Sequence, residues 1–77
     1  AISSIKLNKS ETKKWYKDNV TVYAGSSSNP SIEIALSSSD DESGSVYDLS
    51  SGDYTYFKIV NNSIYAVYMS SIEVIYK

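Results

Sequence analysis

Residues 53–77 carry the sequence DYTYFKIVNNSIYAVYMSSIEVIYK, and they contain the clearest indication of the fold. It holds most of the eight tyrosines, together with the single phenylalanine and the single methionine of the chain. Large apolar side chains recur in it at two-residue spacing, and the breaks are Asn61-Asn62-Ser63 and Ser70-Ser71. Alternation with this composition is typical of neighbouring β-strands. The C-terminal third therefore predicts sheet and not helix.

Shorter stretches upstream carry the same signal, separated by runs of Ser, Gly, Asn and Asp. We expect strands at residues 3–7, 15–24, 32–36, 46–49 and 54–60, with residues 64–69 and 72–76 forming two hairpin strands or one long strand bulged at Ser70-Ser71. Residues 25–31 and 37–45 are expected to be loops. Short strands at roughly ten-residue spacing indicate a sandwich or a small barrel. The prediction is all-β, with residues 1–77 forming one domain: a small antiparallel β-sandwich (or partly open barrel) of six to seven short strands.

The tyrosine-rich strands are apolar on both faces. In the strand that begins at Tyr54, Tyr56 shares one side with Tyr54 and Val60, while Phe57 and Ile59 share the other. We therefore expect central strands that are covered on both sides, with tyrosine hydroxyls at the rim. The alternative is an exposed aromatic surface for binding. The candidate binding residues are Trp15, Tyr16, Lys14, Tyr54, Tyr56, Tyr65 and Tyr76.

Length and composition exclude several kinds of chemistry. A chain of 77 residues leaves little room for a deep cleft, so a site should lie on a face, an edge or a loop. Because there is no Cys and no His, thiolate chemistry, the commonest general base and the commonest metal ligand are absent. No Ser–Lys pair stands out as an activated nucleophile. We expect no enzymatic activity, no bound metal and no cofactor.

Charge is distributed unevenly along the chain, whose net charge is −2. Lysines concentrate in the first 17 residues, around Trp15 and Tyr16, whereas residues 18–57 contain acidic residues and no Lys. Lysines among aromatics occur on surfaces that bind single-stranded nucleic acid, but the negative total charge and the absence of Arg argue against nucleic acid. The expected partner is a protein or a cell-surface polymer. Self-association of a bipolar surface is a further option, as is contact with a membrane surface without spanning it.

These observations favour a small secreted, non-catalytic bacterial β-sandwich that acts by surface contact. The chain begins at Ala1 and is rich in Ser and Tyr, which suggests either a mature chain after signal-peptide removal or an excised domain. One alternative is a secreted antimicrobial or toxin-like protein that acts on a target cell envelope. Another is a protease or enzyme inhibitor that presents loop 25–31 or loop 37–45.

Overall fold

A computed structural model describes residues 1–77 and contains short strands joined by loops and one 3-10 turn. In chain order the elements are β1 (Ile2–Lys9), η1 (Lys17–Asn19), β2 (Val20–Gly25), β3 (Ile32–Ile34), β4 (Ser38–Asp40), β5 (Gly44–Asp48), β6 (Tyr56–Asn61) and β7 (Met69–Tyr76). No helix in the structure is long and apolar enough to cross a membrane.

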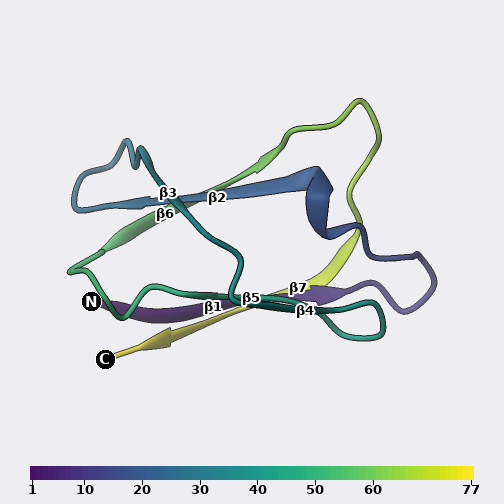
Figure 1. The fold of residues 1–77 in the computed structure, drawn as a ribbon, viewed down its shortest axis with the longest axis horizontal. Coiled ribbons are helices and arrows are strands. Elements are labelled where there is room, and N and C mark those ends of the chain that lie inside the picture. Colours follow the sequence, from purple (N-terminus) through teal and green to yellow (C-terminus); the bar gives the residue numbers. More distant parts are fainter.

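The strands form two antiparallel sheets. One sheet has four strands in the order β4-β5-β1-β7, and the other has three in the order β3-β2-β6. Figure 1 shows the sheets as two layers, with the segments between β3 and β4 and between β6 and β7 crossing from one layer to the other. The predicted all-β sandwich is confirmed, and the two sheets remain separate layers.

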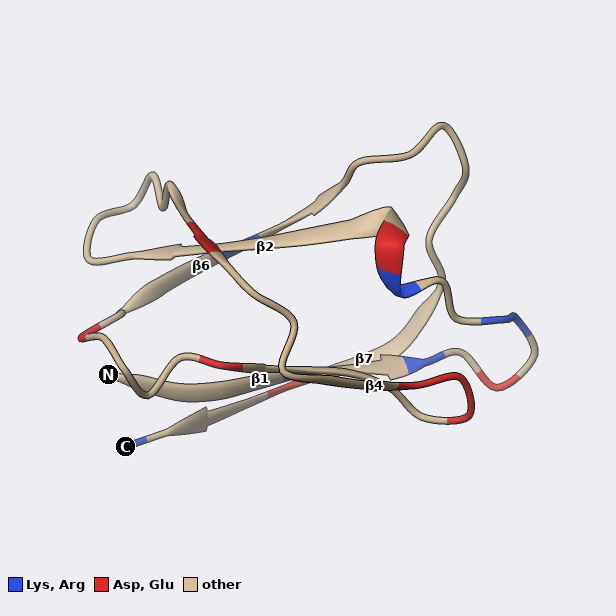
Figure 2. Ribbon diagram, in the orientation of Figure 1, with Lys and Arg blue, Asp and Glu red and all other residues tan.

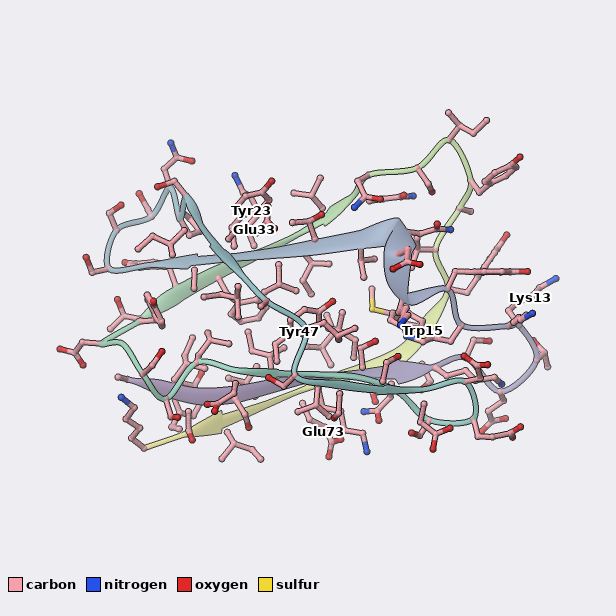
Figure 3. All side chains as sticks on the ribbon, in the orientation of Figure 1. Lys13, Trp15, Tyr23, Glu33, Tyr47 and Glu73 are labelled. Carbon is pink, nitrogen blue, oxygen red and sulfur yellow. The ribbon has the colours of Figure 1, made fainter.

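The core lies between the layers and comes mainly from the strands in the middle of each sheet. β1 and β2 each turn alternate apolar side chains inward, and a bulge between Ile2 and Ser4 brings Ile2 into the same row as Ile5. Tyr47 of β5 also points between the layers (Figure 3). The buried apolar residues are Ile2, Ile5, Leu7, Trp15, Val20, Val22, Ala24, Tyr47 and Leu49.

The expectation that the tyrosine-rich strands lie in the centre of a sheet is wrong, because β6 and β7 are both edge strands. On the inner face of β7, Ile72 remains 44% exposed and Tyr76 69%. The physical reason is that a sheet of three strands is narrower than the sheet of four that it covers. The edge of the larger sheet therefore keeps part of its inner face in solvent.

Two expected boundaries also shift. The strand expected at 15–24 begins only at Val20, because Trp15 lies in a loop and η1 follows it. The stretch expected as a loop at 37–45 contains β4, which forms a hairpin with β5. Gly44 makes this hairpin possible: its φ is +125°, and a Cβ there would lie 1.9 Å from the carbonyl oxygen of Leu7.

The C-terminal segment forms one strand and not a hairpin. Residues 64–68 are a loop, and β7 begins at Met69. The register of β7 on β1 shifts between Asn8 and Lys9, which leaves Ser70 as an extra residue. This bulge lies where the one-strand alternative placed it, and the Ser70 hydroxyl donates to the Lys9 carbonyl at 2.9 Å.

Candidate functional site

Two loops meet at the end of the sandwich that carries η1 and enclose adjoining hollows. A hollow of 190 Å³ lies between the loop before η1 and the loop before β7, and a second of 340 Å³ opens beside it; the two share Tyr16, Asn19 and Ala66. We call them together the tyrosine–lysine groove. Its lining residues are Lys13, Lys14, Trp15, Tyr16, Asn19, Tyr65, Ala66, Val67 and Tyr68.

The loop from residue 62 to residue 68 is shaped by the side chain of Asn61. The amide nitrogen of Asn61 donates to the Tyr65 carbonyl at 2.6 Å, and its amide oxygen accepts from the Ser63 N–H at 2.9 Å. Asn and Ser side chains that bond nearby backbone in this way stabilise turns at the expense of strand. The turn leaves Ile64 92% exposed and Tyr65 70% exposed.

The opposite loop is anchored by Trp15, which is only 2% exposed. Its indole N–H donates to the Ser45 hydroxyl at 2.7 Å, and the Ser45 hydroxyl lies 3.1 Å from that of Ser39. Figure 3 shows the Trp15 side chain beneath η1, between the layers, while Lys13 points outward from the same loop. The buried indole therefore fixes a loop whose neighbouring residues, Lys14 and Tyr16, lie in solvent.

Lysine ammonium groups lie near the aromatic rings of the groove. The Lys13 Nζ is 5.5 Å from the centre of the Tyr68 ring, and the Lys14 Nζ is 5.4 Å from that of Tyr16. These distances are within cation–π range. Tyr16 is 55% exposed and Tyr68 is 51% exposed. The groove therefore presents flat aromatic surface and positive charge together.

Acidic residues also gather at this end of the molecule. A neighbouring hollow is lined in part by Lys17, Asp18 and Asp41. Figure 2 shows many of the charged residues at the η1 end, including the acidic β4–β5 turn. The site is thus positive at the groove and mixed in sign beside it. No group of three or more His, Cys, Asp and Glu side chains is placed so as to hold a metal ion.

The structure divides the sequence-predicted binding residues between the two ends of the sandwich. Lys14, Tyr16 and Tyr65 lie at the groove, and Trp15 lies behind it with almost no exposed surface. The other three predicted residues lie at the far end, where the chain termini meet (Figure 1). They are Tyr54, Tyr56 and Tyr76.

The far-end tyrosines have different surroundings. Tyr54 is half-buried: its ring lies over Gly52, and its carbonyl accepts from the Ile2 N–H at 2.7 Å. Tyr56 begins β6 opposite Gly25 and is 47% exposed. Tyr76 ends β7 opposite Ile2. No pocket joins these three side chains to the groove.

Tyr68 and Asn19 belong to the groove but were not among the sequence-predicted binding residues. The strand expected at 64–69 placed Tyr68 on the face opposite Tyr65, and this parity does not apply to a loop. The sequence feature that could have indicated Tyr68 is the Asn61-Asn62-Ser63 turn, because the side chains of Asn61 and Ser63 donate hydrogen bonds to the Tyr65 carbonyl and so favour a loop there.

Two titratable groups away from the groove have altered acidity. Burial, and secondarily the charge of Asp18, raises the pKa of Tyr47 above its ordinary value. Hydrogen bonding from Ser50, whose backbone N–H donates to the Asp48 carboxylate at 2.8 Å, lowers the pKa of Asp48. Tyr47 is in the core and Asp48 is the last residue of β5, so both shifts belong to the scaffold.

Comparisons of this chain with protein-family models, with curated proteins and with solved structures gave no match.

Proposed function

We propose that this chain is an extracellular, non-catalytic binding module whose tyrosine–lysine groove holds an anionic cell-surface polysaccharide. One observation carries the proposal: Tyr16 and a distant loop that contains Tyr65 and Tyr68 line two adjoining hollows. Lys13 and Lys14 line the same hollow as Tyr68.

The residue types suit such a ligand. Tyrosine offers a rigid apolar ring, which can stack on a sugar ring, and a hydroxyl that can bond to it. Lysines can pair with the acidic groups of the polymer, and the Asn19 amide both donates and accepts hydrogen bonds. A groove that is open at the surface suits a polymer, because the rest of the polymer can extend into solvent beyond the site.

The test is calorimetric titration with a soluble acidic polysaccharide and with a neutral polysaccharide of similar length. We expect binding to the acidic polymer that weakens as salt rises, because salt screens the lysine contribution. Tyr16→Ala and Tyr68→Ala should each weaken binding roughly tenfold, equivalent to about 1.4 kcal/mol. Tyr56→Ala, at the far end of the sandwich, is the matched control and should leave binding unchanged. Equal loss in all three variants, or no binding to the acidic polymer, would refute the proposal.

A lipid headgroup surface is a second candidate, and the exposure of Ile64 favours it. An isoleucine that is 92% exposed at a loop tip beside an exposed tyrosine can enter the interface of a bilayer. Cosedimentation with vesicles that contain anionic lipid tests this function. If it holds, Ile64→Ser should reduce vesicle binding and leave polysaccharide binding intact. Dye leakage from the same vesicles would favour the envelope-active alternative, whereas vesicle binding without leakage would favour simple attachment.

A further inference from the structure

We propose that the free edge of β7 pairs antiparallel with β7 of a second copy of this chain, about a two-fold axis at Val74. The two four-stranded sheets would become one continuous sheet. This surface is separate from the tyrosine–lysine groove, because the pairing uses residues 71–77, whereas the groove is lined by residues 65–68 of the preceding loop.

β7 is the least protected of the sheet edges. The edge strands β3 and β4 have 3 residues each, and β6 has 6 residues with Lys58 in its middle. β7 has 8 residues, and its single charged residue is Glu73. Natural edges are usually protected by shortness, by charge or by proline, and a long apolar edge invites pairing with another strand. β7 has little of this protection.

The backbone of β7 has its unpaired groups at regular positions. In β1, the Ser3 carbonyl and the Lys9 N–H form hydrogen bonds on the side of β5. Because backbone groups alternate in direction along a strand, the N–H and C=O groups of Ser4, Lys6 and Asn8 point toward β7. Their partners on β7 are Ile75, Glu73 and Ser71.

The residues between these partners turn the other way. Ile72, Val74 and Tyr76 therefore direct their N–H and C=O groups to the free edge. The Lys77 N–H, which donates to the Ala1 carbonyl at 2.9 Å, agrees with this alternation. A second strand would find a regular set of donors and acceptors there.

The side chains of the same three residues continue the core row of β1. Ile72 is opposite Leu7, Val74 is opposite Ile5, and Tyr76 is opposite Ile2. The β1 residues are at most 2% exposed, whereas Ile72 and Tyr76 remain 44% and 69% exposed. A copy of β7 placed alongside would extend this apolar row by an identical one, which identifies a second copy as a matching partner.

Only one symmetric register uses the whole exposed row. Centring the axis on Glu73 would place two carboxylates directly opposite each other, which is unfavourable. Centring it on Ile72 runs the pairing into the bulge at Ser70, and centring it on Ile75 leaves Ile72 unpaired. Centring it on Val74 pairs Ile72 with Tyr76 and Glu73 with Ile75 of the second copy. Lys77 then faces an uncharged serine, Ser71.

Opposite charge substitutions at Ile75 test this register. The side chain of Ile75 is 59% exposed and, like that of Glu73 in Figure 3, lies on the outer face of the sheet, so neither substitution disturbs the core. Sedimentation velocity over a concentration series should show a monomer–dimer equilibrium for the unmodified chain. Ile75→Lys should tighten the dimer because it faces Glu73 of the other copy, and Ile75→Glu should weaken it. We expect roughly a tenfold difference in dissociation constant between the two.

Ile64→Lys and Ile64→Glu form the matched control pair, since they make the same charge changes at a loop tip outside the paired strands. The dissociation constants of these two variants should differ far less than those of the Ile75 pair.

A second variant, Ile72→Pro, removes an N–H from the free edge while leaving the β1 ladder intact, and should give a folded monomer. A chain that stays monomeric at millimolar concentration overturns the proposal. So does a dimer that responds equally to both Ile75 substitutions. Polysaccharide binding is measured independently, so failure of one proposal is distinguishable from failure of the other.

Discussion

β1 and β7 lie side by side in one sheet, yet they contribute very differently to the core. β1 reads ISSIKLNK and buries Ile2, Ile5 and Leu7 almost completely. β7 reads MSSIEVIY, and its inner row opposite these residues is partly in solvent. Burial here follows position in the sheet and not apolar content: β1 has a strand on each side and a second sheet above it, whereas β7 has one neighbour and incomplete cover.

Leu7 and Ile72 are opposite each other on β1 and β7, and truncating each in turn should show the largest difference in stability between the two strands. Leu7→Ala removes a side chain with no exposed surface and should lower the free energy of unfolding by about 2–5 kcal/mol. Ile72→Ala, on the neighbouring strand, should cost about 1 kcal/mol, because solvent already reaches that side chain. Urea unfolding of both variants at low protein concentration measures the difference. Equal losses of stability would mean that Ile72 is as fully buried in solution as Leu7 is.

A pair of serine substitutions should show a smaller difference of the same kind. Ser45→Ala leaves the buried indole N–H of Trp15 without its acceptor at 2.7 Å and should cost about 1–3 kcal/mol. Ser71→Ala removes an exposed acceptor, 3.1 Å from the Asn8 amide nitrogen, and should cost at most about 0.5 kcal/mol. Thermal unfolding of the two variants provides the measurement. If Ser71→Ala lowers the stability more than Ser45→Ala does, the hydrogen bond between Asn8 and Ser71 contributes more to the stability than the buried one.

The smallest expected effect concerns alkaline pH. Because burial raises the pKa of Tyr47, the unfolded chain loses this proton at lower pH than the folded chain does. The stability that Tyr47 contributes is therefore fully present below its ordinary pKa of 10.0, and it falls as pH rises through the folded value. Unfolding free energies measured from pH 8 to pH 11, in roughly unit steps, should decline less steeply for Tyr47→Phe than for the unmodified chain. An unchanged slope would show that Tyr47 is hydrated in the folded state.

The architecture was predictable from the sequence because alternation and turn residues are local signals. Residues 25–31 were expected to be a loop by composition; the loop begins after Gly25, which ends β2, and Ile32 begins a strand as expected. Strand order was not predictable, since apolar residues on both faces of β6 and β7 suit a central strand as well as a poorly covered edge. The tyrosine–lysine groove was predictable only in part. Lys14, Tyr16 and Tyr65 could be named by residue type, but their proximity to Tyr68 depends on how two loops meet in the folded chain.

The hydrogen bond between Trp15 and Ser45 also makes tryptophan fluorescence a probe of the end of the sandwich that carries the groove. Trp15 is the single tryptophan, and its ring lies in the core directly behind the groove. Its emission should therefore be blue-shifted in the folded chain and move to longer wavelength when the loop before η1 detaches. Circular dichroism of the sheets would change only when the whole sandwich unfolds. Comparing the two signals along one denaturation curve would show whether the groove end opens before the rest of the molecule.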